Sequence, residues 1–210
     1  TTSDGQGNWS YTPTAAEALA DGDYNFYADA KAANGQESPL TGPYSIEVDT
    51  SIPNPPDTAA GTLKAEDDQG QQKGPINEGD TTDDAKPLLH GTVDVPNGKV
   101  VVIIDQGTPE ERRETVDVDD QGNWNYTPDP ALPDGEHSVE IALIDEAGNG
   151  PSAPGNPLSF IVDTSAVTVT IDKAVDNVPR PGEAPGTTED INEGGKTNDT
   201  TPLIVGSAKV

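Results

Sequence analysis

The segment GNWNYTP at positions 122–128 indicates the fold class of this chain, because it repeats GNWSYTP at positions 7–13. The two copies lie 115 residues apart. In both, Trp and Tyr alternate with polar residues and Pro ends the run, which is the pattern of a β-strand that buries one face. An internal repeat of this spacing indicates an array of similar domains.

Other motifs return at nearly the same spacing. They are VDTS at 48–51 and 162–165, INEG at 76–79 and 191–194, and TDDAKPL at 82–88, which becomes TNDTTPL at 197–203. We therefore expect the second half of one repeat at 1–52, a whole repeat at 53–164 and the first part of a third at 165–210. Thr1 corresponds to Val116 and Val210 to Val95, so the two end segments are open to fraying, swapping or pairing with another chain.

The whole repeat has the pattern of an antiparallel sandwich. Val139, Ile141 and Leu143 alternate on one face, and the run 100–104 is apolar throughout and is expected to be a central strand. Strands are predicted near 62–65 and at 88–93, 99–105, 112–118, 122–127, 136–145 and 156–163, with 167–172 as the first strand of the third copy. About seven strands in roughly 110 residues predict an all-β fold of tandem immunoglobulin-like β-sandwich repeats, one complete and two partial.

Charge and composition limit the partners of the chain. Acidic residues outnumber basic ones 38 to 11, which gives a net charge of -27, so nucleic acid and anionic membranes would repel the chain and cations are its natural partners. The absence of cysteine excludes disulfides, thiol catalysis and zinc–thiolate sites. No apolar run reaches the roughly 18 residues of a membrane helix, so no direct membrane insertion is expected, and any export signal lies outside this sequence.

Five motifs, in their order along one repeat, carry a family resemblance. They are TDDAKP at 82–87, GNWNYTP at 122–128, DGEHS at 134–138, DEAGN at 145–149 and VDT at 162–164. The chain resembles, over nearly its whole length, the bacterial Ig-like repeats of giant non-fimbrial adhesins and Bap-type biofilm-associated proteins. The first copy departs from the pattern, with KAANG at 31–35 where the second has DEAGN.

The resemblance implies a function and a location. Members of the family are exported, typically by type I secretion in Gram-negative bacteria, and display long rods at the cell surface. We therefore expect structural stalk repeats of a secreted adhesin that mediates cell attachment or biofilm cohesion. The expected partners are neighbouring repeats of the same chain, other copies of the adhesin, and host or biofilm surface ligands.

Clustered carboxylates predict calcium sites at the repeat junctions. Calcium takes oxygen ligands, and extracellular modules bind it with a Kd of about 10⁻⁴ to 10⁻³ M. In an Ig-like sandwich the closing strand and the loop between the first two strands end at one pole, and the family resemblance also implies junction calcium. The candidate ligands are Asp163 with Asp67, Asp68, Asp83 and Asp84, and by repeat equivalence Asp49, Asp176 and Asp199. The alternative is that these residues only cap turns and solvate the surface.

Other chemistry has weaker support. The segment from Asp117 resembles the start of an EF-hand loop, but its twelfth position is Pro128 instead of Glu, so a hairpin turn is expected there. Trp124 and Tyr126 are expected to pack in a core, although a carbohydrate- or receptor-binding platform is the alternative. The two histidines, His90 and His137, belong to no catalytic motif. No enzymatic activity is expected, and an accessory domain of an extracellular enzyme is a further alternative.

Overall fold

The chain forms two compact units, Thr1–Val162 and Asp163–Val210. A computed structural model describes residues 1–57, 61–179, 182, 184 and 188–209. The regular structure is almost entirely β, with one short 3-10 helix, η1 (Ala15–Glu17). Within the described residues, no helix is long and apolar enough to cross a membrane.

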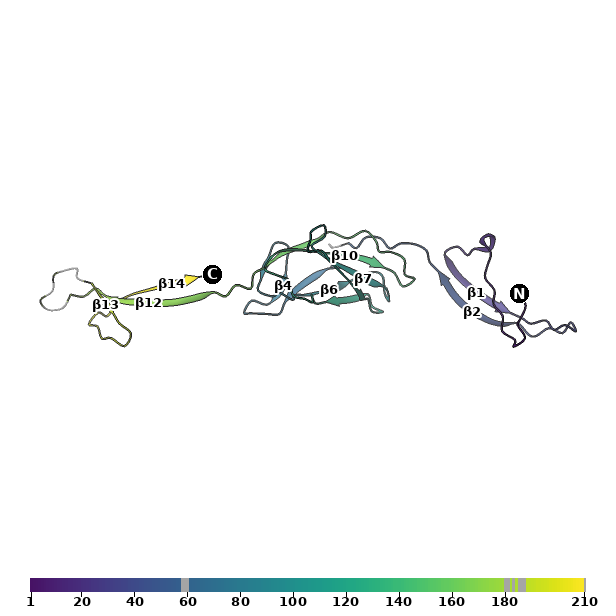
Figure 1. The fold of residues 1–210 in the computed structure, drawn as a ribbon, viewed down its shortest axis with the longest axis horizontal. Helices are drawn as coiled ribbons and strands as arrows, with labels where there is room; N and C mark the ends of the chain where they lie inside the picture. The colour runs from purple at the N-terminus through teal and green to yellow at the C-terminus, as the bar shows by residue number, and fades with distance from the viewer. Residues whose placement is uncertain (58–60, 180–181, 183, 185–187, 210) are drawn as a thin grey trace. The chain divides into compact units, whose positions relative to one another are not determined.

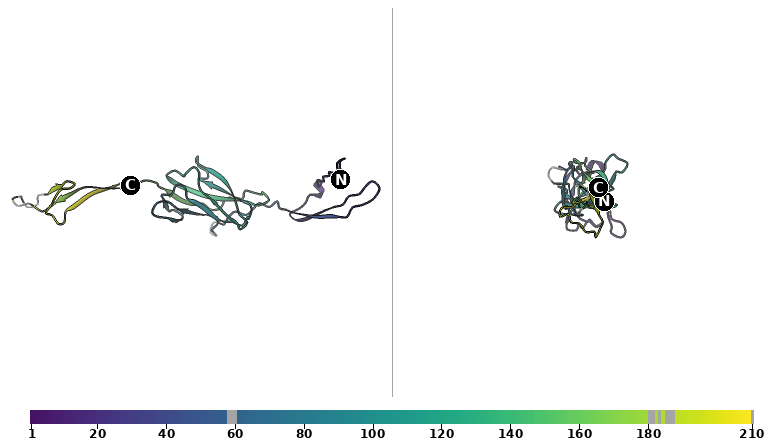
Figure 2. Two further views of the ribbon diagram at one scale, coloured as in Figure 1. Left: turned by 90° about the horizontal axis from the view of Figure 1, so that it is seen from below. Right: turned by 90° about the vertical axis from the view of Figure 1, so that its left-hand side faces the viewer.

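The predicted whole repeat is a β-sandwich of two sheets, seen as two layers in Figure 1 and from below in Figure 2. The first sheet has the order β4-β3-β6-β9 and the second the order β5-β11-β10-β7-β8. The strands are β3 (Lys64–Asp67), β4 (Gly74–Ile76), β5 (Thr81–Thr82), β6 (Leu88–Thr92), β7 (Lys99–Ile104), β8 (Arg112–Asp117), β9 (Asn123–Tyr126), β10 (Gly135–Ile144) and β11 (Leu158–Val162).

The core lies between these sheets and follows the period of two that the sequence shows. Val139, Ile141 and Leu143 of β10 are all fully buried, as is Leu89 of β6 on the facing sheet. Each such side chain contributes about 1.5–3 kcal/mol through loss of apolar surface to water. Strand β7 is buried on both faces, since Ile103 packs in a second small cluster on the outer side of the sheet. Its expected central position is confirmed.

Three expectations about the strands are corrected. The first strand, expected near 62–65, is β3, and the two short strands that follow it, β4 and β5, were not predicted. Between β4 and β5 the chain crosses from one sheet to the other. Strand β5 joins β11 in parallel, so the sandwich is not purely antiparallel. The prediction of a hairpin after Asp117 is wrong. A turn is present, in which Gly122 N donates to Asp119 O at 3.0 Å, but β8 and β9 belong to different sheets.

The remaining segments form smaller sheets. In the first unit, β1 (Gly22–Ala28) pairs with β2 (Thr41–Val48). The second unit holds β12 (Thr168–Asp176), β13 (Glu189–Ile191) and β14 (Leu203–Lys209) in the order β13-β12-β14. These pairings copy the sandwich: Gly22 faces Val48 as Gly135 faces Val162. In the same way Lys173 faces Val205 as Lys64 faces His90.

Candidate functional site

Two predicted calcium ligands, Asp67 and Asp84, form a hydrogen-bonded group with Thr82 at the end of β3. We name this group the Asp–Thr–Asp clamp. Thr82 Oγ1 donates to Asp67 Oδ2 at 2.5 Å and accepts from Asp84 N at 3.0 Å. The Asp84 carboxylate accepts from the N–H groups of Asp68 at 3.3 Å and Lys86 at 2.7 Å. Asp84 is only 1% exposed. The clamp therefore ties the first strand to the segment that enters β6.

The second unit contains the same clamp, formed by Asp176, Thr197 and Asp199. Thr197 Oγ1 donates to Asp176 Oδ2 at 2.7 Å and accepts from Asp199 N at 2.9 Å. Asp199 accepts from Thr201 N at 2.8 Å and Asn177 N at 3.1 Å. The backbone hydrogen bonds from Thr201 and Asn177 hold the pKa of Asp199 below its ordinary value. Four predicted calcium ligands thus serve as internal hydrogen-bond acceptors.

The other predicted ligands lie in turns. Asp49 Oδ1 accepts from Ser51 N at 2.8 Å, and Asp163 Oδ1 accepts from Ser165 N at 3.0 Å, the same turn in two copies. A hydrogen bond from the Ser165 side chain and, to a smaller extent, one from its backbone lower the pKa of Asp163. Asp68 accepts from the Gln69 side chain. The carboxylate of Asp83 lies over Gly70, where a Cβ would be 2.0 Å from its Oδ2.

One acidic surface depression within the first unit was not predicted. Its volume is about 550 Å³, and its lining carboxylates are Glu47, Asp49, Asp94, Asp145 and Glu146. Asn149 Nδ2 donates to both Asp49 O and Asp145 Oδ2 at 3.0 Å. Burial acts to raise the pKa of Asp145, but the hydrogen bonds from Asn149, Gly148 and Ala147 together outweigh it, so this pKa lies below its ordinary value. The DEAGN motif, used only for the family resemblance, was the sequence signal for this loop.

The carboxylate groups described above suit calcium by their chemical type more than by their arrangement. Carboxylate oxygens are hard ligands of the kind that calcium requires. In the described part of the chain, however, no three His, Cys, Asp or Glu side chains are placed to hold a metal ion. The buried Asp84 fits a metal poorly, because its oxygens already accept two backbone hydrogen bonds. Four residues of the acidic depression fit better, because their carboxylates are exposed: Glu47, Asp49, Asp94 and Glu146. Asp145 fits no better than Asp84, since both of its oxygens accept hydrogen bonds from Asn149.

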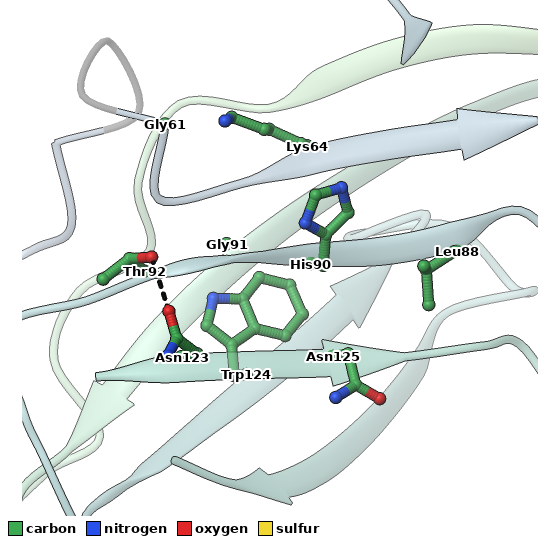
Figure 3. Close-up of a pocket in the computed structure, with 9 residues that line it drawn as sticks. All are labelled: Gly61, Lys64, Leu88, His90, Gly91, Thr92, Asn123, Trp124 and Asn125. Carbon is green, nitrogen blue, oxygen red and sulfur yellow. Dashed lines mark hydrogen bonds between the residues drawn. The ribbon is translucent and has the colours of Figure 1, made fainter. Parts of the chain in front are cut away.

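The aromatic residues of the whole repeat do not form an exposed platform. Trp124 is 2% exposed, and its Nε1 donates to Thr62 O at 2.9 Å. Figure 3 shows the indole pointing from β9 toward β6, beside Gly91. This burial supports the packing role and leaves no stacking surface for a sugar ring. Asn123 and Thr92, which line the same shallow pocket, hydrogen-bond each other at 3.0 Å.

Both histidines have structural environments. His137 is buried, with Nδ1 2.8 Å from Asp105 Oδ2 and Nε2 2.8 Å from Pro133 O. Since both ring nitrogens are engaged, His137 is not placed to act as a general base. His90 Nε2 is buried without a hydrogen bond and lies 3.4 Å from Glu66 Oε1. Neither arrangement resembles a catalytic dyad with a nucleophile.

Comparison with known proteins agrees with this fold. A family model described as "Bacterial Ig-like domain" matches residues 56–164, just over half of the chain and nearly the whole of the predicted complete repeat. No curated protein matches the chain. Domains of the matched kind are typical of extracellular or surface proteins and are generally non-catalytic modules.

Proposed function

Because the chain belongs to the bacterial Ig-like domain family, we propose that it forms part of the stalk of a large secreted bacterial adhesin. In this proposal, tandem Ig-like repeats act as spacers that hold a distant binding region away from the cell. Attachment to host cells or cohesion of a biofilm would be the result. Export by type I secretion from a Gram-negative bacterium belongs to the same proposal.

The observation that carries the proposal is the return of whole hydrogen-bond groups at the repeat spacing. Asp119 accepts from Asn123 N at 2.7 Å and Asn123 Nδ2 at 3.0 Å, and Asp4 accepts the same two bonds from Asn8 at 2.9 and 3.0 Å. The Asp–Thr–Asp clamp likewise occurs twice. Repetition of side-chain geometry as well as sequence supports an array, in which each unit mainly contacts its neighbours.

A stalk would gain reach from each sandwich. Strands of about ten residues at about 3.4 Å per residue give roughly 35 Å per repeat. The absence of cysteine means that stiffness must come from contacts and ions, since no disulfide is available. The net charge of -27 favours bound cations over direct contact between acidic loops.

We propose calcium as the stiffening ion, with the acidic depression as the first place to test. Glu47, Asp49, Asp94 and Glu146 would supply the oxygen ligands. With calcium at about ten times Kd, a site present only in the folded chain would add roughly 1.4 kcal/mol of stability. Asp68, Asp83 and Asp163 remain further candidate ligands.

Thermal unfolding in calcium, in magnesium and in chelator tests this ion. We expect calcium alone to raise the melting temperature by several degrees. Asp94→Asn should reduce that rise, because Asp94 lines the depression. Asp120→Asn, at an exposed turn residue outside the depression, is the matched control. Identical melting temperatures in calcium and chelator would remove calcium from the proposal and leave the spacer role standing.

The spacer role needs its own measurement. A protein with several copies of residues 53–164 in series should lengthen by roughly 35 Å for each added copy in X-ray scattering. Copies that collapse onto one another, so that the maximum dimension grows much more slowly, would contradict a stalk.

A further inference from the structure

His137 is a buried titratable group of the complete sandwich that lies outside the proposed calcium site. Its side chain is 5% exposed, and that of Asp105 beside it is 12% exposed. The imidazole ring also lies near Phe160 of the core, with 6.3 Å between the two ring centroids. Because water reaches neither charged group freely, a change in the protonation of this ring must change the stability of the fold.

Both ring nitrogens of His137 face hydrogen-bond acceptors. Nδ1 lies 2.8 Å from Asp105 Oδ2, and Nε2 lies 2.8 Å from Pro133 O. A carbonyl oxygen cannot donate, and an ionised carboxylate only accepts. Asp105 Oδ1 also accepts from Ser138 N at 2.9 Å, which favours the ionised carboxylate. A neutral imidazole has a single N–H, so only a doubly protonated ring satisfies both contacts.

The carboxylates around the ring favour the same protonated state. In the adjoining surface pocket they are Asp105 and Glu110, which follow β7, Asp134, which precedes β10, and Glu136 in β10. Strand β11 contributes the uncharged Ser159 and Phe160. Among the described residues that line this pocket there is no Lys or Arg. Negative charge near a histidine stabilises its cationic form.

The ring joins two segments that are distant in sequence. We name the group of Asp105, Pro133 and His137 the imidazolium latch. Asp105 N donates to Ser138 O at 2.8 Å, so the backbone of Asp105 is held against the same strand as its carboxylate. Strand β10 begins at Gly135, which faces Val162 at the end of β11. The latch therefore lies near the pole at which the chain leaves the sandwich.

We propose that the folded sandwich holds His137 as an imidazolium and that the imidazolium latch is a pH-sensitive switch at this pole. Loss of one proton leaves a bare ring nitrogen 2.8 Å from an acceptor oxygen, and their lone pairs repel. A histidine in an unfolded chain loses its proton near about pH 6.5. Because the folded chain retains this proton to higher pH, the latch contributes its full stability below that value and loses it as the pH rises. In a stalk, the sandwich would be firmer in acid than in alkaline surroundings.

Nitrogen NMR of the imidazole ring tests the protonation state directly. In a His90→Gln background His137 is the one histidine left in the chain, and at neutral pH both of its ring nitrogens should carry protons. Asp105→Asn should leave one ring nitrogen protonated, since an amide can donate to Nδ1. Asparagine tolerates the φ of 57° at position 105, so the backbone is preserved. A folded parent with one protonated ring nitrogen, or an Asp105→Asn ring that keeps both protons, would overturn the proposal.

Urea unfolding at a series of pH values measures the switch, with Trp124 fluorescence followed in a Trp9→Phe background. Between about pH 6 and about pH 9 the unfolding constant of the parent should rise about 10- to 100-fold more than that of His137→Gln, the factor that a hydrogen bond to a charged group contributes. His90→Gln is the matched control. It alters a histidine of the other sheet whose side chain is 30% exposed, and it should keep the parent profile. Equal alkaline losses in His137→Gln and the parent would refute the switch, as would disappearance of the loss in His90→Gln.

Discussion

Replacing Thr82 with valine tests the Asp–Thr–Asp clamp at its centre. Valine has nearly the same shape and suits a β-strand, so the change removes the hydroxyl with little change in packing. It eliminates the bond to the Asp67 carboxylate and the bond from Asp84 N. Thr82 and Asp84 are both buried, so water cannot easily replace the lost partners.

The magnitude follows from these two bonds. A hydrogen bond to a charged group contributes about 1.5–3 kcal/mol and a neutral one about 0.5–1.5 kcal/mol. The added methyl group returns about 0.8 kcal/mol through its burial. We therefore expect Thr82→Val to lower the free energy of unfolding by roughly 2–3 kcal/mol, which for a domain of this size lowers the melting temperature by roughly 10 °C.

The assay is urea and thermal unfolding followed by Trp124 fluorescence in a Trp9→Phe background, which leaves one tryptophan in the chain. Thr81→Val, at the exposed neighbour in β5, is the matched control and should change stability by less than about 0.5 kcal/mol. The loss should be the same in chelator and in calcium, because the clamp uses protein donors only. A Thr82→Val variant as stable as the control would refute a stabilising clamp.

Three further outcomes are expected for the sandwich. Trp124→Ala should destabilise it by about 3–5 kcal/mol in urea unfolding, since the indole is buried, and a smaller loss would contradict its packing role. Gly122→Ala should lower the free energy of unfolding more than Gly107→Ala does. Both glycines have positive φ, but only at Gly122 would the added Cβ meet a backbone carbonyl oxygen, at 2.3 Å. Hydrogen bonds from Asn123 lower the pKa of Asp119 below the ordinary value of an aspartate, and the pKa of Asp145 is also lowered. Their contribution to stability is present above the unfolded-state pKa and is lost as the pH falls through the folded-state values, so urea midpoints should decline on acidification; a flat acid profile would contradict this.

Local pattern accounts for most of the sandwich. The alternation in β10 and the apolar run of β7 depend only on neighbouring residues, so both strands could be placed from sequence. Strands β4 and β5 could not, because they have only three and two residues and exist through pairing with distant strands. The acidic depression was missed for the same reason, since Asp49 and Asp145 lie far apart in sequence.

Recurring motifs, the prevalence of β-strands and the side chains that share a strand face can all be recognised in the sequence. Which of those faces are covered depends on tertiary contacts. Residues 7–13 and 122–128 are nearly identical, yet Trp124 is buried and Trp9 is exposed. Strand β6 lies beside Trp124, whereas no described strand lies beside Trp9. Burial depends on a partner strand that local sequence does not contain, so equal motifs have unequal environments.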